Sequence, residues 1–367
     1  MKRVLCILSG LDAGGAETFM MKLLRSMDKT QYMMDFCVGN EKEGFYEKEA
    51  VSLGSTIHHI TLKSKNAKQF TKELRTVLKE NNYDAVLRLG DTCISTYDLW
   101  IAKFVGIKRR AMRSCNASSS NGRLNQLIHK CLRRPLSSVA NIKFAPSTEA
   151  AEYTFGPGIV KRGKATLLHN AIDLSVFKYS EDERTKIRRE LDFEGKTVYC
   201  HIGRFSEQKN HGFLIDIFFA IAKQDPNARF LLVGKGDLEE SIKKKVAIMG
   251  LSEKTFFAGV RTDIPGILSA SDVFLLPSLY EGLPNTVVEA QTTGLPCIVS
   301  DTVTREADIT GLVQYLPLGD ADMWAEKCIE VSKHERTTDT RGIFISHCYD
   351  IETITREFEH LIFESVI

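Results

Sequence analysis

The sequence lacks several features that would place it in a special class of protein. Its nine cysteines are odd in number, scattered and never spaced as C-x-x-C, so neither a disulfide framework nor a zinc site is indicated. No apolar stretch approaches the roughly 18 residues of a membrane span. The apolar run in "MKRVLCILSG" is only as long as a strand and leads into a glycine loop, which argues against a secretory signal. We therefore expect a cytoplasmic protein, whose contact with a membrane is limited to the cytoplasmic face of the plasma membrane.

Acidic residues are missing from one window of 50 residues. Leu99–Thr148 contains no Asp or Glu, so it carries +10 while the remainder of the chain carries −8. Its cations are Lys103, Lys108, Arg109, Arg110, Arg113, Arg123, Lys130, Arg133, Arg134 and Lys143. Apolar residues at helical spacing predict a basic amphipathic helix that ends at Pro135, and they are Leu124, Leu127, Ile128, Cys131 and Leu132. Such a helix either packs on a sheet with its charges in water or lies against anionic lipid headgroups, and the 103–143 segment leaves both open.

The length and the apolar periodicity predict two α/β domains. A chain of 367 residues exceeds the usual size of one compact domain. Strand-like runs such as "RVLCILS" and "DAVLRLG" alternate with helical patterns, including one near 66–81, and the alternation begins again after about residue 195. This predicts parallel sheets with helices on both faces. We expect domains at 1–168 and 169–345, joined near 165–177, and a C-terminal helix in 346–367 that packs on either domain.

Glycines and cations follow several of the predicted strands, where doubly wound sheets bind their ligands. Gly10, Gly14 and Gly15 lead from the first strand into a helix and allow close approach to a phosphate or sugar. In "HIGRFSEQKNH", Arg204 and Lys209 follow a strand at the start of a helix, a position that suits a diphosphate. "LLVGKGDLEE" places Gly234 and Gly236 in a further loop of the kind that approaches a nucleotide.

The stretch "EGLPNTVVEA" places two carboxylates at the ends of a nearly uncharged segment. Glu281 belongs to the loop after the buried strand "VFLLPS", and Glu289 lies in the helix that follows, for which Pro284 suits the first position. Eight helical residues span ~12 Å, which is too long for a pair of glycosidase carboxylates that share one bond. The spacing instead suits two hydroxyl-bearing parts of one extended ligand, with the amides after Gly282 directed at an anion between them.

These motifs together resemble those of the retaining nucleotide-sugar glycosyltransferases of family 4, also described as glycosyl transferases group 1. The resemblance rests on E-x7-E after a "PS-x-x-EG" turn, with G-R-x4-K upstream, and it is strongest from Phe144 to Asp301. It implies the GT-B fold, in which two Rossmann-like doubly wound domains face a central cleft. The sequence looks most like members that build bacterial capsular polysaccharide or exopolysaccharide.

The resemblance also implies a role for each matching residue. Arg204 and Lys209 would hold the donor diphosphate, Glu281 would bind donor-sugar hydroxyls or stabilise the oxocarbenium-like centre, and Glu289 would bind the ribose. The other expected donor-site residues are Gly203, Gly234, Val260 (facing the base), Gly282, Leu283 and Asn285. Gly14 and Gly15 would border the reaction centre from the N-terminal, acceptor-binding domain.

The same family implies a hexosyl or N-acetylhexosaminyl transfer without metal or other cofactor. The donor would be a nucleoside-diphosphate sugar, with a UDP-sugar favoured, and the acceptor a glycan that is free or linked to a lipid diphosphate. Arg and Lys side chains and helix dipoles would supply the positive charge that Mg²⁺ supplies elsewhere. The departing diphosphate would take the proton of the acceptor.

The N-terminal domain departs from the family pattern at two strand ends. Relatives usually carry histidines there, whereas this sequence has Arg88 between two leucines, and then Arg113 and Cys115. We hypothesise that Arg113, and with less support Arg88, contacts a phosphate or uronic acid of the acceptor. The alternative is a catalytically weak or inactive relative that binds a nucleotide sugar as a partner subunit.

Two other classes fit the sequence less well. A nicotinamide oxidoreductase would need G-x-G-x-x-G with an acid about 20 residues on, and neither half of the chain has it. A nucleic-acid-binding protein could use the basic window, but that window lacks interleaved aromatic residues and leaves the two glutamates unexplained.

Overall fold

The computed structural model describes residues 1–12, 14–39, 43–90, 93–115, 129–130, 133 and 138–365. The chain divides into two compact units, Met1–Ala171 with Cys348–Ile367, and Ile172–His347. It passes between them after Ala171, inside the stretch 165–177, and again after His347. None of the helices in the described ranges combines the length and apolar character that a membrane span requires.

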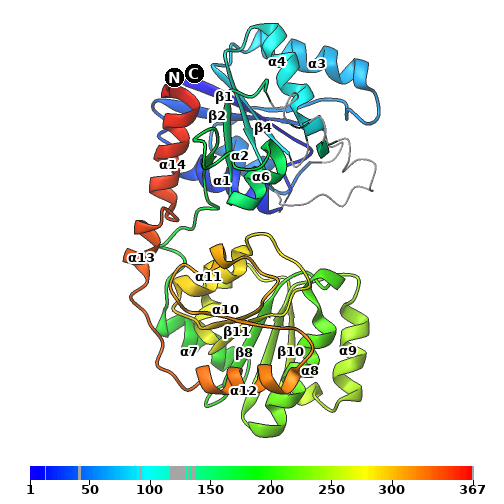
Figure 1. Ribbon diagram of the computed structural model, residues 1–367, viewed down its shortest axis with the longest axis vertical. Coiled ribbons are helices and arrows are strands. Elements are labelled where there is room, and N and C mark those ends of the chain that lie inside the picture. The colour runs from blue at the N-terminus through cyan, green and yellow to red at the C-terminus, as the bar shows by residue number, and fades with distance from the viewer. Residues whose placement is uncertain are drawn as a thin grey trace. The chain divides into compact units, whose positions relative to one another are not determined.

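The first unit contains a seven-stranded parallel sheet with the order β3-β2-β1-β4-β5-β6-β7. Figure 1 labels strands β1, β2 and β4 of this sheet. Its strands are β1 (Lys2–Leu8), β2 (Tyr32–Val38), β3 (Ile57–His59), β4 (Ala85–Leu89), β5 (Arg109–Arg113), β6 (Ile142–Ala145) and β7 (Thr166–Leu167). Its helices are α1 (Gly15–Ser26), α2 (Glu47–Ser52), α3 (Ala67–Glu80), α4 (Tyr97–Val105) after a 3₁₀ turn at Cys93–Thr96, α6 (Thr148–Phe155) and α14 (Ile351–Glu359). The expected strands at "RVLCILS" and "DAVLRLG" and the helix near 66–81 are confirmed.

The second unit repeats this plan with a six-stranded parallel sheet of order β10-β9-β8-β11-β12-β13. Its strands are β8 (Thr197–Ile202), β9 (Ala228–Val233), β10 (Thr255–Gly259), β11 (Val273–Leu276), β12 (Cys297–Ser300) and β13 (Val313–Leu316). Its helices are α7 (Glu181–Glu190), α8 (His211–Gln224), α9 (Glu239–Ile248), α10 (Ile264–Ala270), α11 (Asn285–Thr292), α12 (Ala321–Val331) and α13 (Arg341–Ser346). Short 3₁₀ turns lie at Glu207–Lys209, Ser252–Lys254 and Arg305–Ala307.

Each sheet is buried on both faces, which explains why its strands read as continuous apolar runs. Successive side chains of a strand point to opposite faces, so Phe274 and Leu276 of β11 join one core cluster while Val273 and Leu275 join the other. Helices α7, α10 and α11 cover the first of these faces, and α8, α9 and α12 cover the second. The prediction of two doubly wound α/β domains is therefore confirmed.

The C-terminal helix packs on the first unit, a choice that the sequence had left open. Phe358 of α14 meets Phe144 edge-on at 6.1 Å between ring centroids, and Phe363, in the π-helical turn His360–Glu364, stacks on Tyr32 at 4.7 Å. Arg109 donates from its Nη2 to the carbonyl oxygens of Leu361 (3.2 Å) and Ser365 (2.8 Å). Its charge therefore lies at the carboxyl end of a helix, where a cation is favourable.

Several cations of the basic window Leu99–Thr148 donate hydrogen bonds to backbone oxygens of the first unit. Besides Arg109, Arg110 donates to the backbone oxygens of Val139 and Ile107, and Lys143 donates to that of Ala140. Burial lowers the pKa of Arg110 and of Lys143. The expected amphipathic helix that ends at Pro135 lies almost entirely outside the described residues.

Candidate functional site

The two loops that carry the expected donor-binding residues meet at one edge of the second sheet. Strands β8 and β11 are neighbours there, and the chain continues to opposite sides from them, through β9 and β12. Such a switch point is where doubly wound sheets bind ligands, beyond the carboxyl ends of the strands. Arg204 follows β8 and Glu281 follows β11, so the topology places the G-R-x4-K and E-x7-E motifs beside each other.

The Glu281 carboxylate is held by three donors. Lys209 Nζ lies 2.5 Å from Oε1, Ser278 Oγ donates to the same oxygen at 2.8 Å, and Gln208 Nε2 donates to Oε2 at 3.2 Å. The Glu281 side chain is 8% exposed and that of Lys209 17%, so water screens this ion pair less than it would a surface pair. A carboxylate has about four lone-pair directions, which leaves Glu281 able to accept a further hydrogen bond.

Gln208 and Ser278 were not predicted as site residues, although both lie inside the motifs. Gln208 connects the two loops, because its backbone oxygen accepts from Leu279 N (2.8 Å) and its Nε2 also donates to Tyr280 O (3.1 Å). Ser278 is fully buried, and its backbone oxygen accepts from Ser300 Oγ at 2.6 Å. Their positions in the sequence could have indicated this role, because Gln208 directly precedes Lys209 and Ser278 is the serine of the "PS-x-x-EG" turn.

Arg204 differs from Lys209 in its surroundings. Its side chain is 72% exposed, and the nearest carboxylate, Asp237, lies 3.8 Å from Nη2 and is itself 92% exposed. Such a pair contributes little to stability. The guanidinium is consequently available to an anionic ligand at the end of β8.

Glycine is required at two points of the neighbouring loops. A Cβ on Gly203 would lie 2.8 Å from His201 Nε2. At Gly234 the backbone φ is +137°, and a Cβ would lie 2.1 Å from Gly203 O. The loops after β8 and β9 therefore approach each other as closely as backbone allows.

Two neutral histidines lie beneath the loop after β8. His201 is fully buried and its Nδ1 lies 2.8 Å from Leu275 O, so this nitrogen carries the proton and donates it. The His211 ring lies 4.8 Å from that of His201 and stacks on Phe205 at 4.2 Å. Burial, with a smaller contribution from Lys209, lowers the pKa of His211 to about 4, and burial lowers that of His201 well below its ordinary value. Both rings are therefore neutral at pH 7.

Helix α11 carries the second glutamate of the motif. Glu289 lies inside the helix, as predicted, and is half-buried. Pro284 is the residue before the helix (φ −76°, ψ 107°), not its first position, because the backbone is still extended there. Asn285 begins the helix, and Gly282 and Leu283 lie half-buried in the loop before it.

Gln291 fixes α11 to the segment that follows β12. Its side chain is fully buried. It donates to Ala307 O at 2.7 Å, and its Oε1 accepts from Ile309 N (3.0 Å) and from both the backbone and hydroxyl of Thr310 (3.1 and 2.9 Å). The position of Glu289 therefore depends on a residue that sequence reasoning did not single out. At another strand end, Val260 directly follows β10 and is 69% exposed.

The expected acceptor-side residues of the first unit have different environments. Gly14 is the residue before α1 and Gly15 begins that helix, so both lie beyond the end of β1. Arg88 of β4 points into the unit, where its Nε lies 2.7 Å from Asp98 and its Nη1 donates to Ile7 O at 2.7 Å. The same Asp98 pairs with Lys63 at 2.9 Å.

Arg113 is an interior residue in this structure. It is 1% exposed, its guanidinium lies 4.1 Å above the centre of the Phe19 ring, and its Nη2 donates to Asn170 Oδ1 at 2.6 Å. Burial lowers the pKa of this guanidinium. An acceptor could reach Arg113 only after this part of the unit had rearranged, so its position does not support the hypothesis that it binds one.

The chain is similar to known proteins in both sequence and structure. The family model described as "Glycosyl transferases group 1" matches residues 196–334. The putative glycosyltransferase EpsF of Bacillus subtilis is 33% identical over 336 residues, which are 89% of this chain and 86% of EpsF. The UDP-Gal:alpha-D-GlcNAc-diphosphoundecaprenol alpha-1,3-galactosyltransferase of Escherichia coli is 37% identical over 142 residues, 38% of this chain and 37% of that enzyme.

Among solved structures, Alr3699/HepE of Anabaena in complex with UDP superposes with a TM-score of 0.79. The alignment covers 98% of this chain and 99% of that one at 20% sequence identity, so it shows a common fold.

Proposed function

Because the chain belongs to the group 1 glycosyltransferases and has their GT-B fold, we propose that it transfers a sugar from a UDP-sugar to a glycan acceptor with retention of configuration. The observation that carries this proposal is the Lys209–Glu281 pair at the switch point of the second sheet. The UDP bound to the similar Anabaena protein, and the UDP-galactose named for the E. coli enzyme, favour uridine as the base.

In the proposed reaction, cations of the second unit stabilise the leaving diphosphate. Lys209 has three N–H groups and directs one at Glu281, so the others can donate to phosphate oxygens. Arg204 adds an exposed guanidinium, which suits bidentate binding of phosphate. These fixed charges do the work that a metal ion does in other transferases, and we propose that the reaction needs no metal and no further cofactor.

Glu281 and Glu289 would then bind the two sugars of the donor. Glu281 keeps an accepting direction for a hydroxyl of the transferred sugar, and its negative charge stabilises an oxocarbenium-like centre. Glu289 on α11 would accept from the ribose hydroxyls. The bond between the anomeric carbon and the phosphate oxygen breaks, the acceptor oxygen bonds to that carbon on the same face, and the departing phosphate takes the acceptor proton.

We further propose that the acceptor is a glycan on a lipid diphosphate and that the product enters a bacterial surface polysaccharide. The diphosphoundecaprenol acceptor named for the E. coli galactosyltransferase supports this proposal. Incubation with that acceptor and a panel of UDP-sugars tests it, and nuclear magnetic resonance of the new linkage distinguishes retention from inversion.

Donor binding is best tested by thermal shift with UDP, GDP, ADP, CMP and NAD⁺. A ligand at about 100 times its Kd adds roughly 2.7 kcal/mol to the free energy of unfolding, which raises Tm by about 5–10 °C for a unit of this size. We expect UDP to give this shift, and Lys209→Ala or Glu289→Ala to remove it. The matched control is Glu253→Ala, an exposed glutamate of the same unit. A shift with NAD⁺ alone would contradict the proposal.

A second candidate function is a nucleotide-sugar-binding subunit without activity. The positions of Arg88 and Arg113 favour it, because family members usually have histidines at these strand ends and both arginines are used inside the fold here. Hydrolysis or transfer of a UDP-sugar by the purified protein, lost in Lys209→Ala, would rule it out.

A further inference from the structure

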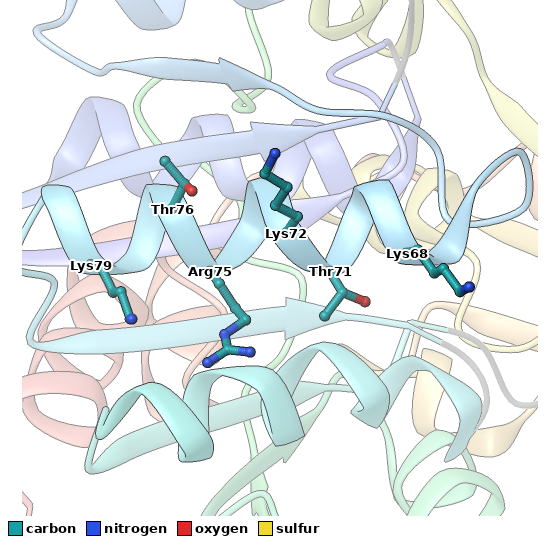
Figure 2. A pocket seen from close by; sticks show the side chains of 6 residues that line it. All are labelled: Lys68, Thr71, Lys72, Arg75, Thr76 and Lys79. Carbon is teal, nitrogen blue, oxygen red and sulfur yellow. The ribbon is translucent and has the colours of Figure 1, made fainter.

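Helix α3 presents a row of cations to solvent. The helix begins after Asn66, whose side chain accepts from Gln69 N, and it buries Phe70, Leu74 and Leu78 against the sheet. The opposite face carries Lys68, Lys72, Arg75 and Lys79, all exposed. At 100° per residue these four lie within about 60° of one another around the helix. With Thr71 and Thr76 they line a shallow hollow of about 360 Å³ (Figure 2).

Of the two acids of α3, Glu80 is the last residue of the helix, and Glu73, the one between Lys68 and Lys79, forms its hydrogen bonds away from the row. Glu73 accepts from Thr61 N at 2.6 Å and from Gln69 Nε2 at 2.7 Å, and the hydrogen bond from Thr61 is the main reason that its pKa is lowered. Within the part of the chain that the structure describes, none of the four cations is in an ion pair. Lys72 is still close enough to Glu73 to contribute to the lowering of its pKa, but none of the four cations is bound by a carboxylate in the described residues.

Helix α4 adds aromatic side chains beside this row. Tyr97, Trp100 and Phe104 follow one another at helical spacing, and Tyr97 OH shares a hydrogen bond with Thr71 Oγ1 of α3 at 2.9 Å. Phe104 is 78% exposed and Tyr97 41%. Lys103 Nζ lies 5.0 Å from the centre of the Trp100 ring. Trp100 packs partly against the core of the unit, and its ring centroid lies 6.3 Å from that of Phe104. Neighbouring exposed apolar side chains of this kind mark surfaces that bind a protein or a membrane.

We propose that the α3–α4 face, formed by Lys68, Lys72, Arg75, Lys79, Tyr97, Trp100 and Phe104, docks on a bilayer that contains anionic lipid. The cations match the phosphates of the headgroups, and aromatic rings are favoured at the level of the headgroups. A soluble polyanion would explain the cations but not the exposed Phe104. The proposal does not depend on the reaction proposed above.

This face shares Phe104 with the 103–143 segment, for which the sequence leaves contact with anionic lipid open, but its row of cations lies outside that segment. Within the described residues of the segment, Arg109, Arg110, Arg113 and Lys143 donate to groups inside the first unit. The linear charge of α3 is diluted by Glu73 and Glu80. Only the direction of the Glu73 side chain shows that the outer face of α3 is purely basic between residues 68 and 79.

Co-sedimentation of the full chain with lipid vesicles tests the proposal. We expect binding to phosphatidylcholine vesicles with about one-third phosphatidylglycerol, little binding to pure phosphatidylcholine, and weaker binding at high salt. Each basic residue at an anionic surface strengthens binding about fivefold, so the loss of three should weaken binding on the order of 100-fold. The triple variant Lys72→Glu, Arg75→Glu, Lys79→Glu should therefore bind at least that much more weakly, because it also adds repulsion. The matched control makes the same charge change at exposed positions of the second unit, with Lys223→Glu, Lys244→Glu and Lys333→Glu.

Further variants separate docking from net charge and from misfolding. If the triple glutamate variant has a lower Tm than the parent, glutamine is placed at the same three positions instead. This variant still tests the proposal, because glutamine removes the positive charges without adding repulsion between negative ones. Phe104→Ser should weaken vesicle binding without lowering Tm, since the ring is exposed. An equal loss of binding in the control variant would overturn the proposal. The proposal would also be overturned if the parent protein bound duplex DNA but not anionic vesicles, and if the triple variant lost the DNA binding.

Discussion

Replacing Arg113 by alanine should destabilise the first unit and should leave acceptor binding by the folded protein unchanged. The substitution removes the hydrogen bond from Nη2 to Asn170, at 2.6 Å, and the packing of the guanidinium on Phe19. A hydrogen bond from a charged group contributes about 1.5–3 kcal/mol, and truncating a buried long side chain costs about 2–5 kcal/mol. Relief of a buried, desolvated charge offsets part of this loss. We expect a net loss of about 3 kcal/mol, and hence a fall in Tm of about 6–12 °C.

Arg113→Met is the matched variant. Methionine keeps most of the apolar stem that packs in the interior and removes the desolvated charge, so it should cost only about 1 kcal/mol. Both variants are compared with the parent by calorimetry, and the KM for the acceptor is measured at a temperature where each is folded. An alanine variant that melts with the parent but shows a raised acceptor KM would refute this reasoning and restore Arg113 to the acceptor site.

Three further predictions concern the second unit. Gln208→Ala should lower kcat/KM for the UDP-sugar about tenfold, because Glu281 Oε2 loses the hydrogen bond from Gln208 that positions it. The Tm should change little, since this hydrogen bond is only partly buried. Steady-state hydrolysis of the donor measures kcat/KM. Gln291→Leu should lower the free energy of unfolding by about 3–5 kcal/mol in urea titrations, because the backbone groups that its amide satisfies stay buried, whereas Gln224→Leu on the surface should not. The pKa of His211 is lower in the folded state, so unfolding takes up a proton between about pH 6.5 and 4, and stability is lost on acidification by up to roughly 1.4 kcal/mol per pH unit. His211→Phe should flatten the dependence of Tm on pH in this range, and an unchanged slope would contradict the assignment.

The local pattern of the sequence was sufficient for the fold of each unit. Strands β1 and β4 and helix α3 follow the predicted runs closely, because burial on both faces makes a parallel strand continuously apolar and a covering helix amphipathic. The resemblance to the family added the architecture and the expected roles of Arg204, Lys209, Glu281 and Glu289. The roles of these four residues in binding and transfer stay predictions, which the variants above test.

The contacts of long side chains could not be predicted in the same way. The charge of Arg113 and its place after a strand are visible in the sequence, but its partner Asn170 lies 57 residues away, and the same charge pattern is compatible with an exposed position. The hydrogen bond from Gln208 to Glu281 likewise joins residues 73 apart. A sequence window holds no information on which of its polar groups will meet a distant partner.

By itself, the sequence therefore determined the α/β class, the two repeats of the doubly wound plan and the motifs that meet at the switch point of the second sheet. The tertiary structure alone placed the C-terminal helix on the first unit, turned Glu73 away from the outer face of α3 and buried Arg113. The physical reason is that secondary structure follows from local periodicity and burial, whereas the direction and the pairing of a charged side chain depend on groups that only folding brings within hydrogen-bonding distance.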